Sequence, residues 1–476
     1  MSSILYYDVC TIIFDFLSFK SKHHAKRMSK ETIKYNITDL LNVHPFFARN
    51  INDRVIGNFN KIKKIKLVDG TFNLDNLKDA DEIELIDANI SLTQSLTKLR
   101  KIKIKQIYAP LETMERLFGD LIILDVELDN YCDYDRDYWM RLKMLEELTI
   151  KRCFGIKFIL PRLKKIKINA GVGSSIGQEF IDNHADIEHF ETLNHRYYDY
   201  GFNDELNISN LTKLKTLIAN VTNEELINFT NLTELRTRKV SNIDYLTNLE
   251  ILDVVDCDVL NIEKLTKLKE LCVKHGIYHQ EQLNKFDLTK LVVSQNEGFY
   301  HMTNLIYLAN SHVIINSNIN NLTNLQVLML YSCGMKDVTL DLPNLKKLCI
   351  ENCNIKNIDN LKTLKELTVK NCEFINDRSI RKLEDLEYLD ISNQKQILNI
   401  SKFKKLKYLD ISNRQNIDLS KIDCLKNLEF VNIINTKKGK KLRDESCIDI
   451  SSQYTYKNGI KYLYNPKRKL ILKHVR

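Results

Sequence analysis

Residues 321–369 read NLTNLQVLMLYSCGMKDVTLDLPNLKKLCIENCNIKNIDNLKTLKELTV and repeat one short pattern. The pattern L-x-x-L-x-x-L-x-L-x-x-C begins three times, with Ile or Val replacing the fourth leucine in two copies. Its positions are Leu322, Leu325, Leu328, Leu330 and Cys333, then Leu342, Leu345, Leu348, Ile350 and Cys353, then Leu361, Leu364, Leu367, Val369 and Cys372. The copies step by about 20 residues, a period typical of solenoid proteins.

The spacing within each copy predicts a short strand. In Leu328-Met329-Leu330 the two leucines alternate with Met329, so they point to one side of a strand and Met329 points to the other. A coil of about 20 residues cannot bury its own leucines, so neighbouring coils must cover them. The pattern therefore predicts a stack of coils whose strands lie side by side.

The pattern resembles the leucine-rich repeat family. The resemblance implies an α/β solenoid, a right-handed superhelix with a concave parallel β-sheet and mostly short 3₁₀ or extended segments on the convex side. Cysteine or asparagine at the last position then points inward where the chain leaves the strand. Five cysteines fall there: Cys153, Cys257, Cys333, Cys353 and Cys372.

The repeats are predicted to span residues 59–436 in about 19 units. Each unit has one central apolar anchor in its strand, equivalent to Leu328. We assign the anchors to Ile65, Ile83, Ile102, Leu124, Leu148, Ile166, Phe190, Leu217, Leu235, Leu252, Leu271, Leu291, Leu308, Leu328, Leu348, Leu367, Leu389, Leu409 and Val431. Two longer units are expected to carry helix, at Met114–Leu117 and Ser174–Asn183.

The composition fits a folded protein without linkers. Of the 476 residues 43% are hydrophobic and 28% charged, with only 13 Gly and 5 Pro. The net charge of +9 is spread over local lysine clusters, which favours a solvated surface over a nucleic-acid site. The 11 cysteines show no disulfide framework, and no signal peptide or membrane-spanning segment is expected. We therefore expect a monomeric, cytoplasmic protein with no membrane contact, without excluding the nucleus.

Residues 1–58 do not follow the repeat. This segment resembles an F-box, with a phenylalanine-leucine pair ending a first helix and Asp39-Leu40-Leu41-Asn42-Val43 opening a later one. The usual leading Leu-Pro is absent, and the link between the halves is long. The resemblance implies docking on a Skp1-like adaptor through Leu5, Val9, Ile13, Leu17, Leu41, Val43, Phe46 and Phe47. The alternative is a helical cap over the first repeat.

Residues 437–476 form a basic tail in which the repeat fades. Alternation in Ile460–Tyr464 predicts a strand, and we interpret the tail as a C-terminal cap.

No constellation predicts chemistry. The glycines of Ala170–Gln178 miss the dinucleotide fingerprint by one residue and lack its βαβ context. Asp182, His184, Glu188, His189 and His195 match no zinc spacing. Cys349 and Cys353 should point to opposite sides of one coil, so they cannot share a metal. We expect no enzyme activity, no cofactor and no metal.

What remains is a binding surface. The outward strand positions are small, polar and weakly charged, which suits protein recognition more than phosphate binding. The candidate partner-binding residues on the concave face are Met329, Tyr331, Glu351, Asn352, Lys370, Asn371, Asp390, Asn393, Asp410 and Asn413. By resemblance the protein would be an F-box/LRR-like substrate receptor of a Skp1-cullin-type ubiquitin ligase. The alternative is a scaffold or regulatory subunit without that link.

Overall fold

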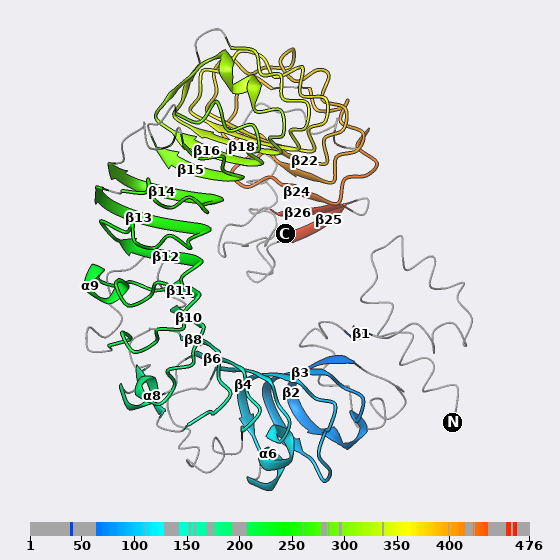
Figure 1. The fold of residues 1–476 in the computed structure, drawn as a ribbon. Helices are drawn as coiled ribbons and strands as arrows, with labels where there is room; N and C mark the ends of the chain where they lie inside the picture. Colours follow the sequence, from blue (N-terminus) through cyan, green and yellow to red (C-terminus); the bar gives the residue numbers. More distant parts are fainter. Residues whose placement is uncertain are drawn as a thin grey trace. The chain divides into compact units, whose positions relative to one another are not determined.

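A computed structural model of the chain describes most of the repeat region. The described residues are 39–40, 63–109, 111–127, 142–151, 154–156, 159–168, 175–176, 178–192, 207–259, 261–277, 283, 285–294, 298–335, 338–397, 399–414, 422, 424–436, 454–457 and 460–463. The chain divides into two compact units, Met1–Lys239 and Val240–Arg476. Figure 1 shows that strands dominate both units and that consecutive strands within each lie side by side.

Unit 1 is built on parallel strands, each paired with the next. They are β2 (Lys64–Asn73), β3 (Glu82–Ser91), β4 (Lys101–Tyr108), β5 (Ile123–Glu127), β6 (Glu147–Lys151), β8 (Lys165–Ile168), β10 (His189–Thr192), β11 (Thr216–Ile218) and β12 (Glu234–Lys239). A second small parallel pair joins β7 (Phe154–Ile156) to β9 (Ser175–Ile176).

Unit 2 continues the same arrangement with parallel neighbours throughout the repeats. They are β13 (Ile251–Val259), β14 (Glu270–Ile277), β15 (Lys290–Ser294), β16 (Tyr307–Ser311), β18 (Val327–Tyr331), β20 (Lys347–Glu351), β21 (Glu366–Lys370), β22 (Tyr388–Asp390), β23 (Tyr408–Asp410) and β24 (Phe430–Asn432). A small parallel pair joins β17 (Ile314–Ile315) to β19 (Gly334–Met335).

The tail adds two strands to this sheet. The strand β26 (Ile460–Leu463) pairs in parallel with β24, and β25 (Tyr454–Lys457) pairs antiparallel with β26. The strand predicted from alternation in the tail is therefore confirmed.

The predicted anchors form one row within each unit. Leu328 is the register partner of Leu308 on one side and of Leu348 on the other. All nineteen predicted anchors are at most 4% exposed. Because each coil leaves its leucines uncovered, burial to this extent requires the neighbouring coils. The repeat register predicted from the sequence is confirmed.

The returning segments are short and mostly irregular. Helices are α6 (Leu111–Phe118), α8 (Gln178–Asp182) and α9 (Asn223–Leu226), and 3₁₀ turns are η1 (Leu74–Asn76) and η2 (Ser317–Asn321). The helix predicted at Met114–Leu117 is confirmed by α6. Of the helix predicted at Ser174–Asn183 only the second half is confirmed, by α8, because Ser175–Ile176 form the strand β9. The helix α9 begins with a capping box in which Thr222 accepts from the Glu225 backbone N–H.

Asparagines that lie four or seven residues before an anchor tie several coils to the one before. The Nδ2 of Asn231 donates to the carbonyl of Thr212 at 3.2 Å, and Asn324 donates to Thr303 at 3.0 Å. Asn210 donates in the same way to the carbonyl of Ile181 at 3.2 Å. The Ile181 carbonyl also accepts from the His184 N–H of its own coil at 3.1 Å. The bonds between coils give the repeated asparagines a role in coil stacking.

A second repeated position is the turn that follows the anchors of unit 2 from Leu308 onward. The residue four positions after the anchor has a positive φ at His312, Ser332, Asn352, Asn371, Asn393, Asn413 and Asn435. Asparagine is the residue other than glycine that tolerates this left-handed conformation best. The next residue points inward, where Cys333, Cys353 and Cys372 are buried as predicted.

The segment before the repeats contributes one described element. Asp39 and Leu40 form the strand β1, which pairs in parallel with Lys64 and Ile65 of β2. The expectation that a helix opens at Asp39-Leu40 is therefore wrong, because both residues pair with β2 as a strand. The predicted adaptor-docking residues lie outside the described residues, as do Cys153 and the glycines of 171–177.

Candidate protein-binding face

The outward face of each sheet carries three rows of side chains. Relative to the buried anchor, row A lies one residue before it, row B one residue after it and row C three residues after it. Around Leu328 these are Val327, Met329 and Tyr331, all less buried than the anchor. Residues of one row on neighbouring strands are register partners, so they come within about 5 Å although they lie about 20 residues apart in sequence.

In unit 1 the outward face is a charge ladder. Glu84 in row B of β3 bonds Lys66 of β2 at 3.2 Å and Lys103 of β4 at 3.1 Å. In row A, Glu82 bonds Lys101 at 2.7 Å. Partial burial raises the pKa of Glu84, but the two lysines outweigh it and hold that pKa below its ordinary value. Charges that alternate from strand to strand satisfy one another and leave little net field for a partner.

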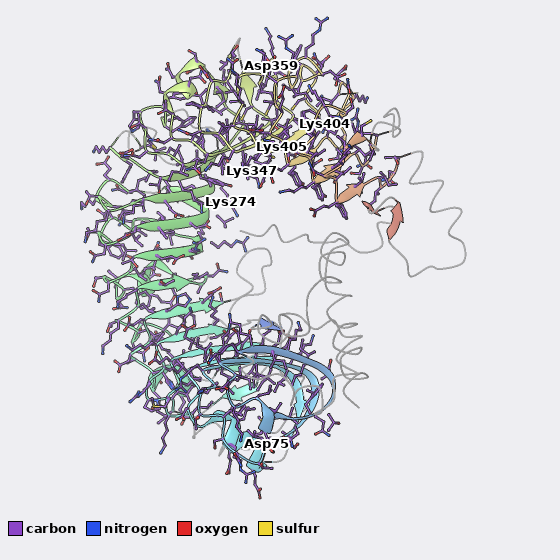
Figure 2. The ribbon with its side chains drawn as sticks, turned by 90° about the vertical axis from the view of Figure 1, so that its right-hand side faces the viewer. Asp75, Lys274, Lys347, Asp359, Lys404 and Lys405 are labelled. Atoms are coloured by element: carbon purple, nitrogen blue, oxygen red, sulfur yellow. The ribbon has the colours of Figure 1, made fainter. Side chains whose placement is uncertain are left out.

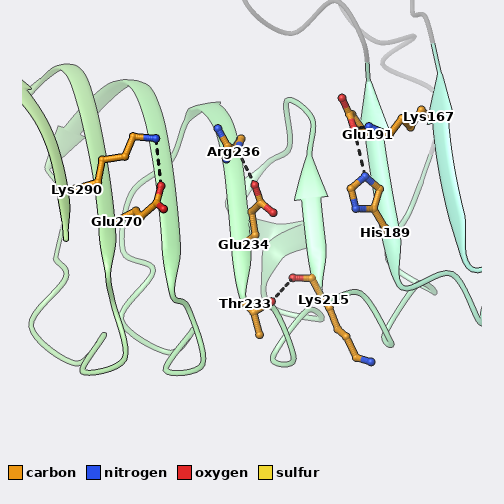
Figure 3. Close-up of polar contacts among 9 residues, drawn as sticks. All are labelled: Lys167, His189, Glu191, Lys215, Thr233, Glu234, Arg236, Glu270 and Lys290. Atoms are coloured by element: carbon orange, nitrogen blue, oxygen red, sulfur yellow. Dashed lines mark hydrogen bonds and ion pairs between the residues drawn. The ribbon is translucent and has the colours of Figure 1, made fainter. Parts of the chain in front are cut away.

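The ladder continues on β8 and β10. His189 and Glu191 contact at 3.2 Å between Nε2 and Oε2, and Lys167 of the neighbouring strand bonds the same carboxylate (Figure 3). The hydrogen bond from His189 lowers the pKa of Glu191 to about 2, against the opposing effect of burial and with help from Lys167. Lys167 and Glu191 are register partners, so this ion pair depends on the register of β8 and β10.

In unit 2 the central strands replace charge with soft, apolar side chains. We call this the soft patch: Val292, Ala309, Met329 and Cys349 in row B, with Tyr307 of row A and Tyr331 of row C. The hydroxyl of Tyr307 donates to the sulfur of Met329 at 3.1 Å, and that of Tyr331 lies 3.7 Å from the same sulfur. Tyr331 remains 37% exposed. An exposed aromatic ring beside a polarisable thioether is a surface suited to apolar contact.

The tyrosines of the soft patch interact with neighbouring side chains. Burial, and then the neighbouring Cys349 thiol, raise the pKa of Tyr331 above its ordinary value. Lys290 lies over the ring of Tyr307, 5.7 Å from its centre. Lys290 also pairs with Glu270 at 3.2 Å, as Figure 3 shows. Lys274 and Lys347, labelled in Figure 2, extend from the strands of this unit, whereas Asp359 lies in a returning loop.

The last strands of unit 2 carry an aromatic row. We call Tyr388, Tyr408 and Phe430, all in row A, the aromatic ladder. Tyr388 and Tyr408 stack with ring centres 4.4 Å apart and planes 5° apart, and Tyr408 and Phe430 stack at 5.0 Å and 7°. Stacking of successive rings follows from strand spacing, because register partners lie about 4.8 Å apart. All three rings are half-buried.

Row B beside the aromatic ladder holds a carboxylate pair. Asp390 pairs with Lys370 at 3.1 Å and accepts from the Ser392 hydroxyl at 2.7 Å. Asp410 accepts from the Ser412 backbone N–H at 2.9 Å and from Asn432 Nδ2 at 2.8 Å. Burial and then the charge of Asp390 raise the pKa of Asp410.

The structure distributes the predicted partner-binding residues over two environments. Met329, Tyr331, Glu351, Lys370, Asp390 and Asp410 lie in rows B and C, as expected from alternation. Asn352, Asn371, Asn393 and Asn413 are exposed but occupy the left-handed turn, so backbone conformation explains their identity. Asp390 is only 6% exposed, which corrects its expected open position, because Lys370 and Ser392 cover it.

Sequence reasoning missed row A. Tyr307, Tyr388, Tyr408 and Phe430 precede their anchors and were not among the candidates, although three of the four follow a lysine or glutamate at the same place in the pattern. The signal that could have found them is an aromatic residue directly before an anchor leucine or valine. In strands this residue shares a face with row B.

The remaining candidates have structural roles. Cys349 is half-buried on the outward face and Cys353 is buried, so the two do point to opposite sides. Nε2 of the buried His184 accepts from the Leu160 N–H at 2.8 Å, and burial lowers the pKa of His184.

Among the described residues no three histidine, cysteine or acidic side chains are placed to hold a metal. No helix in this part of the chain is long and apolar enough to cross a membrane.

Comparison with known proteins finds likeness in architecture only. No protein-family model and no curated protein matches the chain. An LRR protein of Leptospira interrogans aligns with 18% identity, 85% of this chain, 98% of its own and a TM-score of 0.39. Internalin InlF of Listeria monocytogenes aligns with 15% identity, 75% and 87% coverage and a TM-score of 0.33. The receptor kinase ectodomain GASSHO1/SCHENGEN3 of Arabidopsis thaliana was solved with Casparian strip integrity factor 2. It aligns with 16% identity over 80% of this chain and 57% of its own, with a TM-score of 0.37.

The fold assignment therefore rests on the chain itself. The recurring leucine pattern, the parallel register of its anchors and their burial define a leucine-rich repeat solenoid.

Proposed function

We propose that this protein is a non-catalytic protein-interaction module whose partner docks on the outward face of unit 2. The observation that carries the proposal is the soft patch, where the half-buried Met329 and the exposed Tyr331 occupy strand positions that carry paired charges in unit 1. Tyrosine and methionine are enriched in the cores of protein interfaces. Few contacts of this kind supply most of the binding free energy at an interface.

Two features favour a protein partner over nucleic acid. The soft patch is apolar, and row B beyond it carries carboxylates that would repel phosphates. Several lysines on the outward face are paired with acidic neighbours, as for Lys347 with Glu366 at 2.9 Å. A phosphate backbone requires unpaired cations in greater density.

The finer proposal concerns residues 1–58. By their resemblance to an F-box, we propose that this segment recruits a Skp1-like adaptor while residues 59–436 hold the protein to be ubiquitinated and residues 437–476 cap the solenoid. The buried free thiols of Cys333, Cys353 and Cys372 suit a reducing compartment such as the cytoplasm. The alternative is a scaffold or regulatory subunit without a ligase.

Quantitative affinity capture from the native cell tests the interaction function. The wild-type protein is compared with Met329→Glu, which buries a charge in the soft patch, and with Lys362→Glu, a control at an exposed loop position. We expect proteins retained by the wild type and by Lys362→Glu to be lost with Met329→Glu. Identical retention by all three proteins would contradict the proposed face.

A second measurement separates the two finer proposals. Purified Skp1 is mixed with the full chain and with a Phe46→Ala/Phe47→Ala variant. Binding that the variant loses supports the adaptor role, whereas no binding of the full chain favours the scaffold.

A further inference from the structure

We infer that the carboxylate end of unit 2, Asp410 with Asp390 beside the aromatic ladder, binds an arginine or lysine side chain of the partner segment that docks on the soft patch. The inference rests on the proposed function and adds the chemistry of the partner. It predicts that the partner segment has an apolar residue that contacts Met329 and, at a fixed distance along the segment, a basic residue that contacts the carboxylates.

The charges on this part of the face favour a cation. Asp390 and Asp410 are register partners on β22 and β23, and only one lysine, Lys370, pairs with them among the described contacts. The negative field extends over the aromatic ladder as well. The pKa of Tyr388 is raised first by burial and then by the neighbouring ring of Tyr408. The charges of Asp390 and Asp410 raise it further.

The surroundings would strengthen a salt bridge formed here. Asp410 lies between its neighbours on β22 and β24, and Asn432 and Ser412 hold its orientation. The rings of Tyr388 and Tyr408 stack two residues before Asp390 and Asp410 on the same face, and together they form an apolar wall next to row B. Long basic side chains pack their methylene stems on such walls while the charged end reaches the carboxylate. Arginine fits best, because its planar guanidinium donates two parallel hydrogen bonds.

Strand spacing sets the distance between the two contacts. From Met329 on β18 to Asp390 on β22 the sheet advances by three strands, β20, β21 and β22, and Asp410 is one strand further. At about 4.8 Å per strand these distances are about 14 and 19 Å. An extended peptide crossing the strands advances about 3.3–3.6 Å per residue. The basic residue is therefore expected roughly four to six positions from the apolar one.

The other possible occupants fit less well. A metal ion would need a third ligand, and none is in place among the described residues. An anionic partner would meet two like charges. A second copy of this chain would have to bring to the patch a cation without an acidic partner of its own, whereas outward-face lysines such as Lys66, Lys103 and Lys347 are paired.

Selection from a random peptide library displayed on phage tests the inference with the full chain as bait. The baits are the wild type, Asp410→Asn, Asp385→Asn and Met329→Glu. Asp385 lies in a loop and pairs with Lys405 at 2.6 Å, so Asp385→Asn makes the same change in net charge away from the face. Circular dichroism of each bait checks that it is folded.

We expect wild-type selections to enrich peptides with Arg or Lys four to six residues from a large apolar residue. Asp410→Asn should keep the apolar preference and lose the basic one, and Asp385→Asn should behave as the wild type. Enrichment of apolar residues alone, or a basic preference unchanged by Asp410→Asn, would overturn the inference and leave the proposed function standing. No enrichment relative to Met329→Glu would overturn both.

Synthetic peptides give the sharper readout. Replacing the selected Arg by Gln should weaken binding to the wild type about tenfold or more, the usual effect of losing a charged hydrogen bond. The same replacement should change binding to Asp410→Asn little, because the partner charge is already gone. Equal losses on both proteins would place the Arg contact elsewhere and refute the inference.

Discussion

Asp410 lies directly opposite Asp390 in the parallel register of β22 and β23, so two carboxylates share one row of the sheet. Like charges in facing positions destabilise a sheet. Asp390 is compensated by Lys370 at 3.1 Å, whereas the described contacts of Asp410 are hydrogen bonds to neutral groups. The facing carboxylates thus destabilise the sheet at the place where we propose that a partner's cation binds.

Asp410→Asn is expected to stabilise the free protein at pH 7 by about 1 kcal/mol. Burial and Asp390 raise the pKa of Asp410 in the folded state, so its ionised form opposes folding above the ordinary aspartate pKa of 3.8. This penalty disappears as pH falls through the raised pKa, and the gain from the substitution should shrink accordingly. Urea unfolding at several pH values measures it. Asp385→Asn serves as the control, and a gain of the same size there would contradict the explanation.

Glu191→Gln should destabilise unit 1 at neutral pH. The contact with His189, together with Lys167, lowers the pKa of Glu191 from 4.5 to about 2, so its ionised form favours folding. That contribution is present above pH 4.5 and is lost as pH falls toward about 2. Allowing for solvent screening, we expect a loss of about 1–2 kcal/mol at pH 7. Unfolding curves at pH 7 and pH 3 should show the deficit shrinking on acidification; a constant deficit would indicate lost packing instead.

Asn413 distinguishes a backbone role from a binding role. Its φ is 61° and its N–H donates to the Ile434 carbonyl at 2.8 Å. Asn413→Ala should cost about 1 kcal/mol because alanine resists the left-handed conformation, whereas Asn413→Gly should cost less. Thermal unfolding compares the two. If Asn413→Gly also leaves selected peptides bound at unchanged affinity, Asn413 is not a partner contact.

Cysteine reactivity should follow the geometry of the coil. Cys424 is exposed, Cys349 is half-buried, and Cys333, Cys353 and Cys372 are buried. Burial also raises the pKa of the Cys349 and Cys372 thiols, which lowers the reactive thiolate fraction. Iodoacetamide at pH 8 should modify Cys424 first and Cys372 only after unfolding. Peptide mass spectrometry over time measures the order, and early labelling of Cys372 would show that the coils open in the native state.

The sequence by itself determined the repeat. Leu328 and Leu348 could be assigned as neighbours because a pattern of buried and exposed positions within one coil, repeated about every 20 residues, leaves only one register that covers the leucines. The helices α6 and α8 were predictable for the same reason, since only the longer units have residues to spare for a helix. The inward position of Cys353 and the outward position of Cys349 follow from alternation alone.

Only the tertiary structure decided what each outward residue meets. Asp390 and Asp410, or Tyr388 and Tyr408, become neighbours because parallel pairing places residues about 20 positions apart side by side. Whether such neighbours attract, stack or repel depends on the side chains of the adjacent coil. Lys370 therefore covers Asp390, while Tyr331 remains exposed. Side-chain identity fixes which positions are inside, whereas charge compensation and exposure are properties of pairs, and the pairs exist only once the coils are stacked.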